Sequence, residues 1–255
     1  RIYKISWLRD IILTDRLMER CKRFVYWKGE AMKGKLIIIE GGDGSGKATQ
    51  TKLLVEHLQR DGKAVRAVSF PDYDSDSSAL VKMYLRGDFG SEADAVNPYA
   101  ASAFYAVDRF ASYQMKWKQF LAEGGIVIAD RYTTSNMLYQ MIKIDSPSQQ
   151  HAYLDWLEDF EFDKMGLPRP DCVILLDVPL AVTEQLMAQR VGKTGGQTGD
   201  IHEGNENFLR RCHEAYDVLA EKYQWQRISC AVHNEMRSVQ AIHEDVYQRV
   251  MQIVL

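Results

Sequence analysis

Short apolar runs and amphipathic segments alternate along the chain from residue 35 onwards. The apolar runs are rich in β-branched residues, which is typical of strands buried on both faces of a sheet. They predict five strands, at residues 36–40, 63–71, 125–130, 171–179 and 226–230. Apolar residues elsewhere recur at helical spacing, which predicts helices over residues 49–62, 77–87, 97–125, 133–141, 148–162, 180–190, 206–223 and 237–251.

Strands and helices that alternate in this way form a parallel sheet with helices on both of its faces. We therefore predict an α/β fold with a five-stranded parallel sheet. The sequence contains no evident internal repeat or linker after residue 33, so residues 33–255 are expected to form a single domain. Residues 1–32 are basic and aromatic-rich, and we expect them to be an extension outside this core, either helical or without fixed structure.

The overall composition excludes several classes of protein. The chain has 255 residues and a net charge of −3, so no basic field favours a nucleic-acid partner. Its apolar runs all fall well short of the ~20 residues that cross a bilayer, which argues against a membrane partner. The four cysteines are scattered, without the spacing of a zinc or redox site, and are expected to be thiols in a reducing compartment. We therefore predict a cytoplasmic protein.

The segment that follows the first predicted strand carries the most specific motif. Gly41, Gly46 and Lys47 fit the pattern G-x-x-x-x-G-K, and a predicted helix begins directly after them. Glycines let backbone N–H groups turn towards phosphate oxygens, and the start of the helix adds free amides and a favourable dipole. A lysine at this position offers its charge to the β- and γ-phosphates. The sequence therefore predicts a P-loop that binds a nucleoside triphosphate.

The P-loop departs from its usual form at Ala48, where a serine or threonine commonly binds Mg²⁺ through its hydroxyl. Either Thr49 supplies that hydroxyl, or the metal depends on water, phosphates and a carboxylate. Mg²⁺ commonly keeps several waters, so the loss of one protein ligand is tolerable. Asp43 in the loop and Asp130 at the end of the third strand are the available carboxylates, and both are expected at the carboxyl edge of the sheet.

Three further clusters are expected near the same edge, at residues 69–73, 104–110 and 130–140. Each combines an aromatic side chain with a charged one, and such pairs can stack on a base or bind a phosphate. Taken singly they are ambiguous, because Phe70, Tyr105 and Tyr139 could equally be core residues. Arg109 lies on a long predicted helix, where an arginine is more often solvated than a ligand.

Together, these clusters and the P-loop resemble the thymidylate kinase family. The residues that carry the resemblance are EGGDGSGKATQ (40–50), FPDY (70–73), YAVDR (105–109) and DRYTTSNMLYQ (130–140). The likeness spans residues 33–230, and a Gly-rich, basic segment at about residues 190–204 matches the short mobile lid of these P-loop kinases. It implies ATP- and Mg²⁺-dependent phosphorylation of dTMP to dTDP in dTTP synthesis. It also implies a homodimer.

The resemblance also implies roles for individual residues. It assigns the ATP phosphates to Gly41, Gly42, Asp43, Gly44, Ser45, Gly46, Lys47, Ala48 and Thr49. It assigns dTMP to Phe70, Tyr73, Tyr105, Arg109, Arg131, Asn136 and Tyr139, the first two flanking the acceptor. Within that set, Tyr105 would stack on thymine and Arg109 would hydrogen-bond the base. Arg131 would bind the acceptor phosphate, while Asn136 and Tyr139 would contact the base and exclude a ribose 2′-hydroxyl.

The catalytic set implied by the resemblance combines the P-loop with the lid. Lys47, Asp43 and Arg131 are its members in the core, and Asp130 and Thr49 would hold the metal. The P-loop contains Gly44 and Ser45 and no arginine, and family members of that kind place basic residues in the lid. Arg190 and Lys193 are the lid candidates here. Asp72 is a second departure, because a basic residue often occurs in that short stretch.

Two other interpretations remain open on the sequence. The first is another nucleoside monophosphate kinase of the same fold, since one sequence does not fix base selectivity. The second is a non-catalytic P-loop nucleotide-binding protein, which the missing hydroxyl at Ala48 would suit. The acceptor-side clusters would have no purpose in such a protein.

Overall fold

The computed structural model describes residues 34–254 apart from residues 91, 93, 184 and 186–205. Residues from Gly34 onwards form one compact unit. The predicted extension and the lid, with Arg190 and Lys193, lie outside the described residues. No helix in the described part of the chain is long and apolar enough to cross a membrane.

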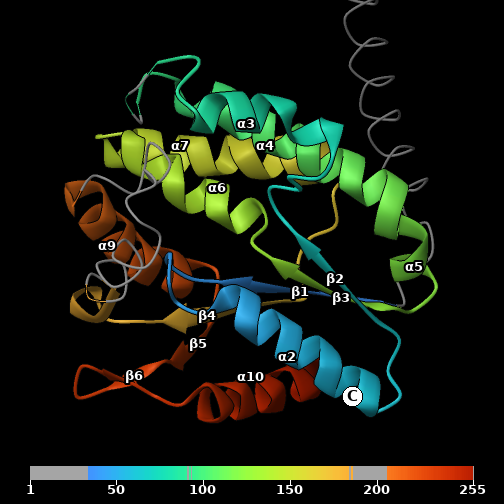
Figure 1. Ribbon diagram of the computed structural model, residues 1–255. Helices are drawn as coiled ribbons and strands as arrows, with labels where there is room; N and C mark the ends of the chain where they lie inside the picture. The colour runs from blue at the N-terminus through green and yellow to red at the C-terminus, as the bar shows by residue number, and fades with distance from the viewer. Residues whose placement is uncertain (1–33, 91, 93, 184, 186–205, 255) are drawn as a thin grey trace, which may run out of the picture. The chain divides into compact units, whose positions relative to one another are not determined.

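The sheet has five parallel strands, as predicted, and their order is β2-β3-β1-β4-β5 (Figure 1). The strands are β1 (Lys35–Glu40), β2 (Val65–Ser69), β3 (Ile126–Asp130), β4 (Cys172–Asp177) and β5 (Gln226–Ser229). The central strand β1 pairs with β3 and β4 and is buried from Leu36 to Glu40. Its aliphatic run is explained by this position, because helices cover both of its faces.

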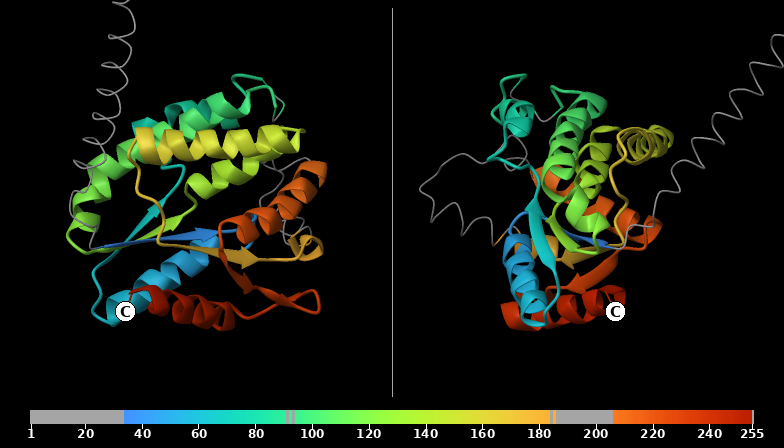
Figure 2. Two further views of the ribbon diagram at one scale, coloured as in Figure 1. Left: turned by 180° about the vertical axis from the view of Figure 1, so that it is seen from behind. Right: turned by 90° about the vertical axis from the view of Figure 1, so that its right-hand side faces the viewer.

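Alternate side chains of β1 enter two separate cores. Ile37 and Ile39 pack with Leu54 of α2 (Lys47–Arg60) and Val246 of α10 (Val239–Val254). Leu36 and Ile38 belong to the larger core on the opposite face, which is covered by helices from the middle of the chain. Figure 2 shows the helices on the two faces of the sheet from behind and from the side.

The remaining elements lie mostly on the larger core's face of the sheet. The helices are α3 (Ala79–Leu85), α4 (Pro98–Ser112), α5 (Lys118–Ala122), α6 (Thr133–Tyr139), α7 (Pro147–Glu158) and α9 (Glu206–Lys222). The short helical turns are η1 (Asp76–Ser78), η2 (Tyr113–Trp117), η3 (Met141–Lys143) and η4 (Asp159–Lys164). A small hairpin of β6 (Ala231–Val232) and β7 (Glu235–Met236) precedes α10; its turn places His233 and Asn234 at positive φ, which suits a two-residue hairpin loop.

Two predicted helices are interrupted by π-helical turns. The helix expected over residues 97–125 is divided by the π-helical turn η2, and the one expected over 148–162 ends in the π-helical turn η4. Such turns rotate the following side chains relative to a regular helix and occur frequently at functional sites. The turn η4 carries Glu161, which is completely buried.

The strand order brings three chain segments to one edge of the sheet. Asp130 at the end of β3 lies opposite Ile39 of β1 on one side and Ser69 of β2 on the other. The P-loop leaves β1 at this edge and leads into α2. Ligands of such sheets bind outside the carboxyl ends of the strands, and this edge is therefore where a site is expected.

Candidate active site

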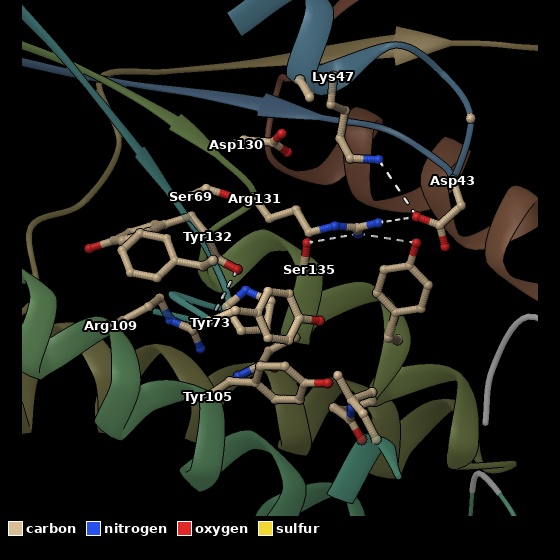
Figure 3. Close-up of a pocket in the computed structure, with 18 of the residues that line it drawn as sticks. Asp43, Lys47, Ser69, Tyr73, Tyr105, Arg109, Asp130, Arg131, Tyr132 and Ser135 are labelled. Carbon is tan, nitrogen blue, oxygen red and sulfur yellow. Dashed lines mark hydrogen bonds and ion pairs between the residues drawn. The ribbon is translucent and has the colours of Figure 1, made fainter. Parts of the chain in front are cut away.

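A cavity of about 530 Å³ lies at the carboxyl edge of the sheet. It is lined by the P-loop, the end of β2, α4, and the segment from β3 into α6 (Figure 3). The predicted site residues that line it are Asp43, Gly44, Gly46, Lys47, Ala48, Thr49, Phe70, Tyr73, Tyr105, Arg109, Asp130, Arg131, Asn136 and Tyr139. The fold thus brings the P-loop and all three predicted acceptor clusters around one cavity.

The P-loop depends on glycine at two positions. Gly41 has φ +154°, and a Cβ there would lie 2.7 Å from Ser45 Oγ and 3.0 Å from the carbonyl oxygen of Leu176. Gly46 has φ +91° at the N-cap of α2, a left-handed conformation that favours glycine. The helix therefore begins at Lys47 with its amino end directed at the cavity.

Lys47 is buried beside the loop. Its Nζ donates to the carbonyl oxygens of Gly41 and Gly42 at 2.8 Å each, and it lies 3.9 Å from Asp43 Oδ1. Burial, and then the charge of Arg131, lower the pKa of Lys47 to about 8. The lysine is thus an ammonium group in a poorly solvated position, where an added phosphate charge would be strongly attractive.

Arg131 is the second cation of the cavity and comes directly after β3. Its Nη2 forms an ion pair with Asp43, and its Nη1 donates to Tyr139 Oη at 3.2 Å and to Ser135 Oγ at 3.5 Å (Figure 3). Its backbone has φ +67°, which is uncommon for a residue with a side chain. Such backbone conformations concentrate at functional sites, where surrounding contacts hold them in place.

A buried carboxylate that the sequence analysis missed, Glu40, supports this part of the cavity. Glu40 Oε2 accepts hydrogen bonds from Thr134 Oγ1 at 2.7 Å and Ser135 Oγ at 2.8 Å, and its Oε1 accepts from the Gly41 N–H at 3.0 Å. Its Oε1 also lies 3.9 Å from Arg131 Nη1. The sequence feature that could have identified Glu40 is a charged residue at the end of an otherwise aliphatic predicted strand. Glu40 thereby ties the start of the P-loop to α6.

A second missed carboxylate, Asp108, holds the segment that carries Tyr73. Asp108 is 1% exposed, and it accepts hydrogen bonds from the Asp72 N–H at 2.8 Å and from Ser77 Oγ at 2.6 Å. Asp72, the departure noted in the sequence, forms an ion pair with Lys116. The backbone after Phe70 is therefore fixed to α4, while Tyr73 stays exposed at the cavity.

Arg109 is only 1% exposed, in contrast to the solvated arginine that its place on a long helix favours. Its Nε donates to Glu161 Oε2 at 2.8 Å and its Nη2 to Glu161 Oε1 at 2.5 Å. Glu161 lies 52 residues further along the chain, so no local sequence pattern predicts this pair. Tyr105 is one turn earlier on α4 and contacts Tyr84 edge to face. Both Tyr105 and Arg109 line the cavity.

Asp130 is a carboxylate of the cavity that could hold a divalent cation. Asp130 makes no side-chain hydrogen bond to any residue that the structure describes, and burial raises its pKa although Lys47 and Arg131 lower it in part. No cluster of three or more His, Cys, Asp or Glu side chains placed to hold a metal exists among the described residues. Mg²⁺ takes one or two carboxylates and otherwise water and substrate phosphates.

A P-loop at the edge of a five-stranded parallel sheet, facing a second cluster of cations and aromatics, defines a P-loop nucleotide kinase site. Comparison with known proteins specifies the family. The family model described as thymidylate kinase matches residues 39–245. The chain belongs to the thymidylate kinase family.

Individual relatives agree with this assignment. The chain is 31% identical to thymidylate kinase of Mycobacterium tuberculosis over 187 residues, which is 72% of this chain and 85% of that protein. It is 32% identical to a probable thymidylate kinase of Pyrococcus horikoshii, over 84% of this chain and 95% of that protein. The solved structure of thymidylate kinase from Candida albicans has the same fold, with a TM-score of 0.64 at 22% identity, over 86% of this chain and 92% of that one.

Proposed function

We propose that the chain transfers the γ-phosphoryl group of ATP to dTMP and forms dTDP in the synthesis of dTTP. The observation that carries the proposal is that Lys47 of the P-loop lines the same cavity as Arg131, Arg109 and Tyr105. A protein that only binds ATP would not require the acceptor-side residues Arg131, Arg109 and Tyr105. Relatives named thymidylate kinase or probable thymidylate kinase that align with most of the chain support the choice of acceptor.

Catalysis in this proposal is positioning and charge neutralisation. The second pKa of a phosphate monoester is ~6, so the acceptor is mostly a dianion at pH 7 and needs no strong general base. Lys47 would neutralise the β- and γ-phosphates, and Arg131 would hold the acceptor phosphate. The ion pair between Arg131 and Asp43 keeps the arginine directed at the P-loop side of the cavity. In-line transfer between two fixed phosphates then gains most of its rate from orientation.

The base would lie at the other end of the cavity. Tyr105 offers a ring for stacking, and Arg109 and Asn136 offer polar groups from α4 and α6. Tyr139 is held by its hydrogen bond from Arg131 and would exclude a ribose 2′-hydroxyl. These assignments rest on the family resemblance and on the common cavity.

Mg²⁺ is proposed as the metal partner of ATP. Asp130 would hold it on the protein side, with Thr49 as a P-loop hydroxyl that lines the cavity. When bound, the ion would neutralise charge on the β- and γ-phosphates. Arg190 and Lys193, which lie outside the described residues, are proposed to supply the charge that the P-loop lacks at Gly44 and Ser45. The lid as a whole is proposed to exclude water from the reaction.

A homodimer is proposed on the resemblance and on one surface of α4. Val107 and Phe110 are exposed on this helix, and Met115 of the following turn is exposed as well. Exposed apolar side chains so close together on one helix suit burial against a second copy. Light scattering should give a dimer for the parent and a monomer for Val107→Glu. A monomeric parent would contradict the proposal.

A coupled assay for ADP tests the proposed reaction directly. With ATP, Mg²⁺ and a panel of dTMP, dUMP, UMP, CMP and GMP, we expect ADP to form fastest with dTMP. ADP formed at the same rate without any acceptor would favour a nucleotide-hydrolysing protein, and no preference within the panel would favour a broader monophosphate kinase. A crystal with both nucleotides should place the pyrimidine beside Tyr105 and Arg109, and a position elsewhere would refute the acceptor site.

A further inference from the structure

Glu161 is a buried carboxylate that joins two side chains of the cavity, Arg109 and Asn136. It is 0% exposed in the π-helical turn η4. Glu161 Oε2 accepts hydrogen bonds from Arg109 Nε at 2.8 Å and Thr133 Oγ1 at 2.7 Å. Its Oε1 accepts from Arg109 Nη2 at 2.5 Å and Asn136 Nδ2 at 3.1 Å. The four acceptor positions of the carboxylate are thereby all in use.

This pairing determines which N–H groups of Arg109 remain for a ligand. A guanidinium has five N–H donors in a rigid plane. Glu161 receives two of them in a bidentate arrangement, which fixes the plane of the group. Nη1 lies 3.5 Å from the carbonyl oxygen of Tyr132, a long contact that one of its two hydrogens can make. Arg109 therefore remains a donor towards the cavity that it lines.

The same carboxylate determines the orientation of the Asn136 amide. An ionised carboxylate can only accept, so the group of Asn136 that faces Glu161 must be the nitrogen. The second hydrogen of Nδ2 is directed to the carbonyl oxygen of Ser102 at 3.2 Å. Both donors are thus committed, and no described residue donates to Asn136 Oδ1. The oxygen is therefore the polar group that Asn136 offers to the cavity.

We propose that Glu161 is a positioning residue that sets the hydrogen-bonding polarity of the base pocket, with Arg109 as donor and Asn136 as acceptor. A pyrimidine with a 4-oxo group and an N3–H presents an acceptor beside a donor, which matches this pattern. A 4-amino pyrimidine presents a donor at N4 beside an unprotonated N3, which is the reverse. The inference rests on the proposed function and adds that discrimination against a cytosine base originates in a residue that never contacts the nucleotide.

Glu161→Gln tests this inference, because an amide oxygen can accept but its nitrogen donates. At least one of Arg109 and Asn136 then loses its acceptor, and the Asn136 amide is free to rotate. We expect the ratio of kcat/KM for dTMP to that for dCMP to fall by at least about tenfold. KM for dTMP should rise, while KM for ATP stays within about twofold of the parent value.

Glu158→Gln is the matched control from the preceding turn of the same helical segment. Glu158 accepts hydrogen bonds from Tyr223 Oη at 2.7 Å and Arg169 Nη1 at 2.8 Å, and it does not line the cavity. The substitution weakens two carboxylate hydrogen bonds outside the cavity, so the dTMP to dCMP ratio should not change. A control that loses as much discrimination as Glu161→Gln would overturn the inference.

Because Glu161→Gln leaves the charge of Arg109 unpaired in the core, the thermal unfolding midpoint is measured for every variant. Glu161→Asp keeps the charge and withdraws it by one methylene, so it should fold and show a smaller fall in the same ratio. A folded Glu161 variant with a ratio within about twofold of the parent overturns the inference, as does failure of both variants to fold. A parent that does not phosphorylate dTMP instead refutes the proposed function, which separates the two failures.

Discussion

The two ends of the cavity are built in different ways. The donor end is one continuous stretch, residues 41–49, in which backbone amides and Lys47 are proposed to bind the phosphates, with Asp43 and Thr49 beside them. The acceptor end takes side chains from the segment after β2, from α4 and from the segment that joins β3 to α6. A backbone site tolerates changes of side chain, which explains how Ala48 can occupy its position. A side-chain site requires every contributing segment to be held in place.

Buried carboxylates provide that support at the acceptor end. Glu40 holds Thr134 and Ser135 of α6, Asp108 holds the segment after Phe70, and Glu161 holds Arg109. Each carboxylate is at most 1% exposed. A buried charge without its partners is costly, so each of these groups favours one arrangement of the cavity wall over others. The difference between the two ends predicts the effects of the following changes, from the largest to the smallest.

Lys47→Ala should have the largest effect, because it removes the P-loop cation that is proposed to neutralise the β- and γ-phosphates. We expect kcat to fall by about 10³-fold. The fold should survive, because the loss of the lysine's hydrogen bonds to the carbonyl oxygens of Gly41 and Gly42 is offset by removal of a buried cation. Steady-state kinetics and circular dichroism check the two expectations together. Near-normal turnover would show that the backbone amides suffice and that Lys47 has no catalytic role.

Arg131→Ala should raise KM for dTMP by about 10²-fold, with little change in KM for ATP. The guanidinium is the cation proposed for the acceptor phosphate, and Asp43 also loses its partner. Arg131→Gly removes the same charge but suits φ +67°, so it should unfold at a higher temperature than Arg131→Ala. Arg227→Ala, which breaks ion pairs with Asp177 and Asp217 away from the cavity, is the control. An equal rise in both KM values would mean that Arg131 serves both ends.

The pH dependence of kcat/KM for ATP tests the role of Lys47 at the donor end of the cavity. The pKa of Lys47 is lowered to about 8, so its charged form is lost as the pH rises through that value. We expect kcat/KM for ATP to fall about tenfold between pH 8 and pH 9.5, because kcat/KM follows the groups of the free enzyme. Lys143 also has its pKa lowered to about 8 but does not line the cavity. Lys143→Met should therefore show the same fall in kcat/KM for ATP. If the fall disappears in that variant, the titrating group is Lys143 and not Lys47.

Ala48→Ser should have the smallest effect, a gain of about two- to fivefold in apparent affinity for Mg²⁺ at fixed ATP. The serine restores the hydroxyl that most P-loops offer to the metal. Titration of activity with Mg²⁺ measures the change, and Ala48→Gly serves as a variant without a hydroxyl. An unchanged midpoint in Ala48→Ser would indicate that Asp130, water and phosphates already complete the coordination.

The sequence predicted the elements and the P-loop well and the support of the acceptor end poorly. All five strands of the sheet were found, because their aliphatic character follows from burial on both faces. Arg109 was found only as a candidate through resemblance, and its burial was not expected. Its counter-ion Glu161 and the supporting carboxylates Glu40 and Asp108 were missed. The π-helical turns η2 and η4 were missed as well, since each interrupts a helical pattern without a proline or glycine.

The sequence by itself determined the succession of strands and helices along the chain and the phosphate-binding loop. Apolar periodicity and a glycine motif both depend on neighbouring residues. The tertiary structure decided which charges face the cavity and which are paired behind it. Arg109 and Glu161 meet across 52 residues, and Arg131 and Asp43 meet across 88. No local pattern encodes such partners. The packing of α4 beside the turn η4 brings Arg109 to Glu161, and the pairing of β1 with β3 brings Arg131 to Asp43.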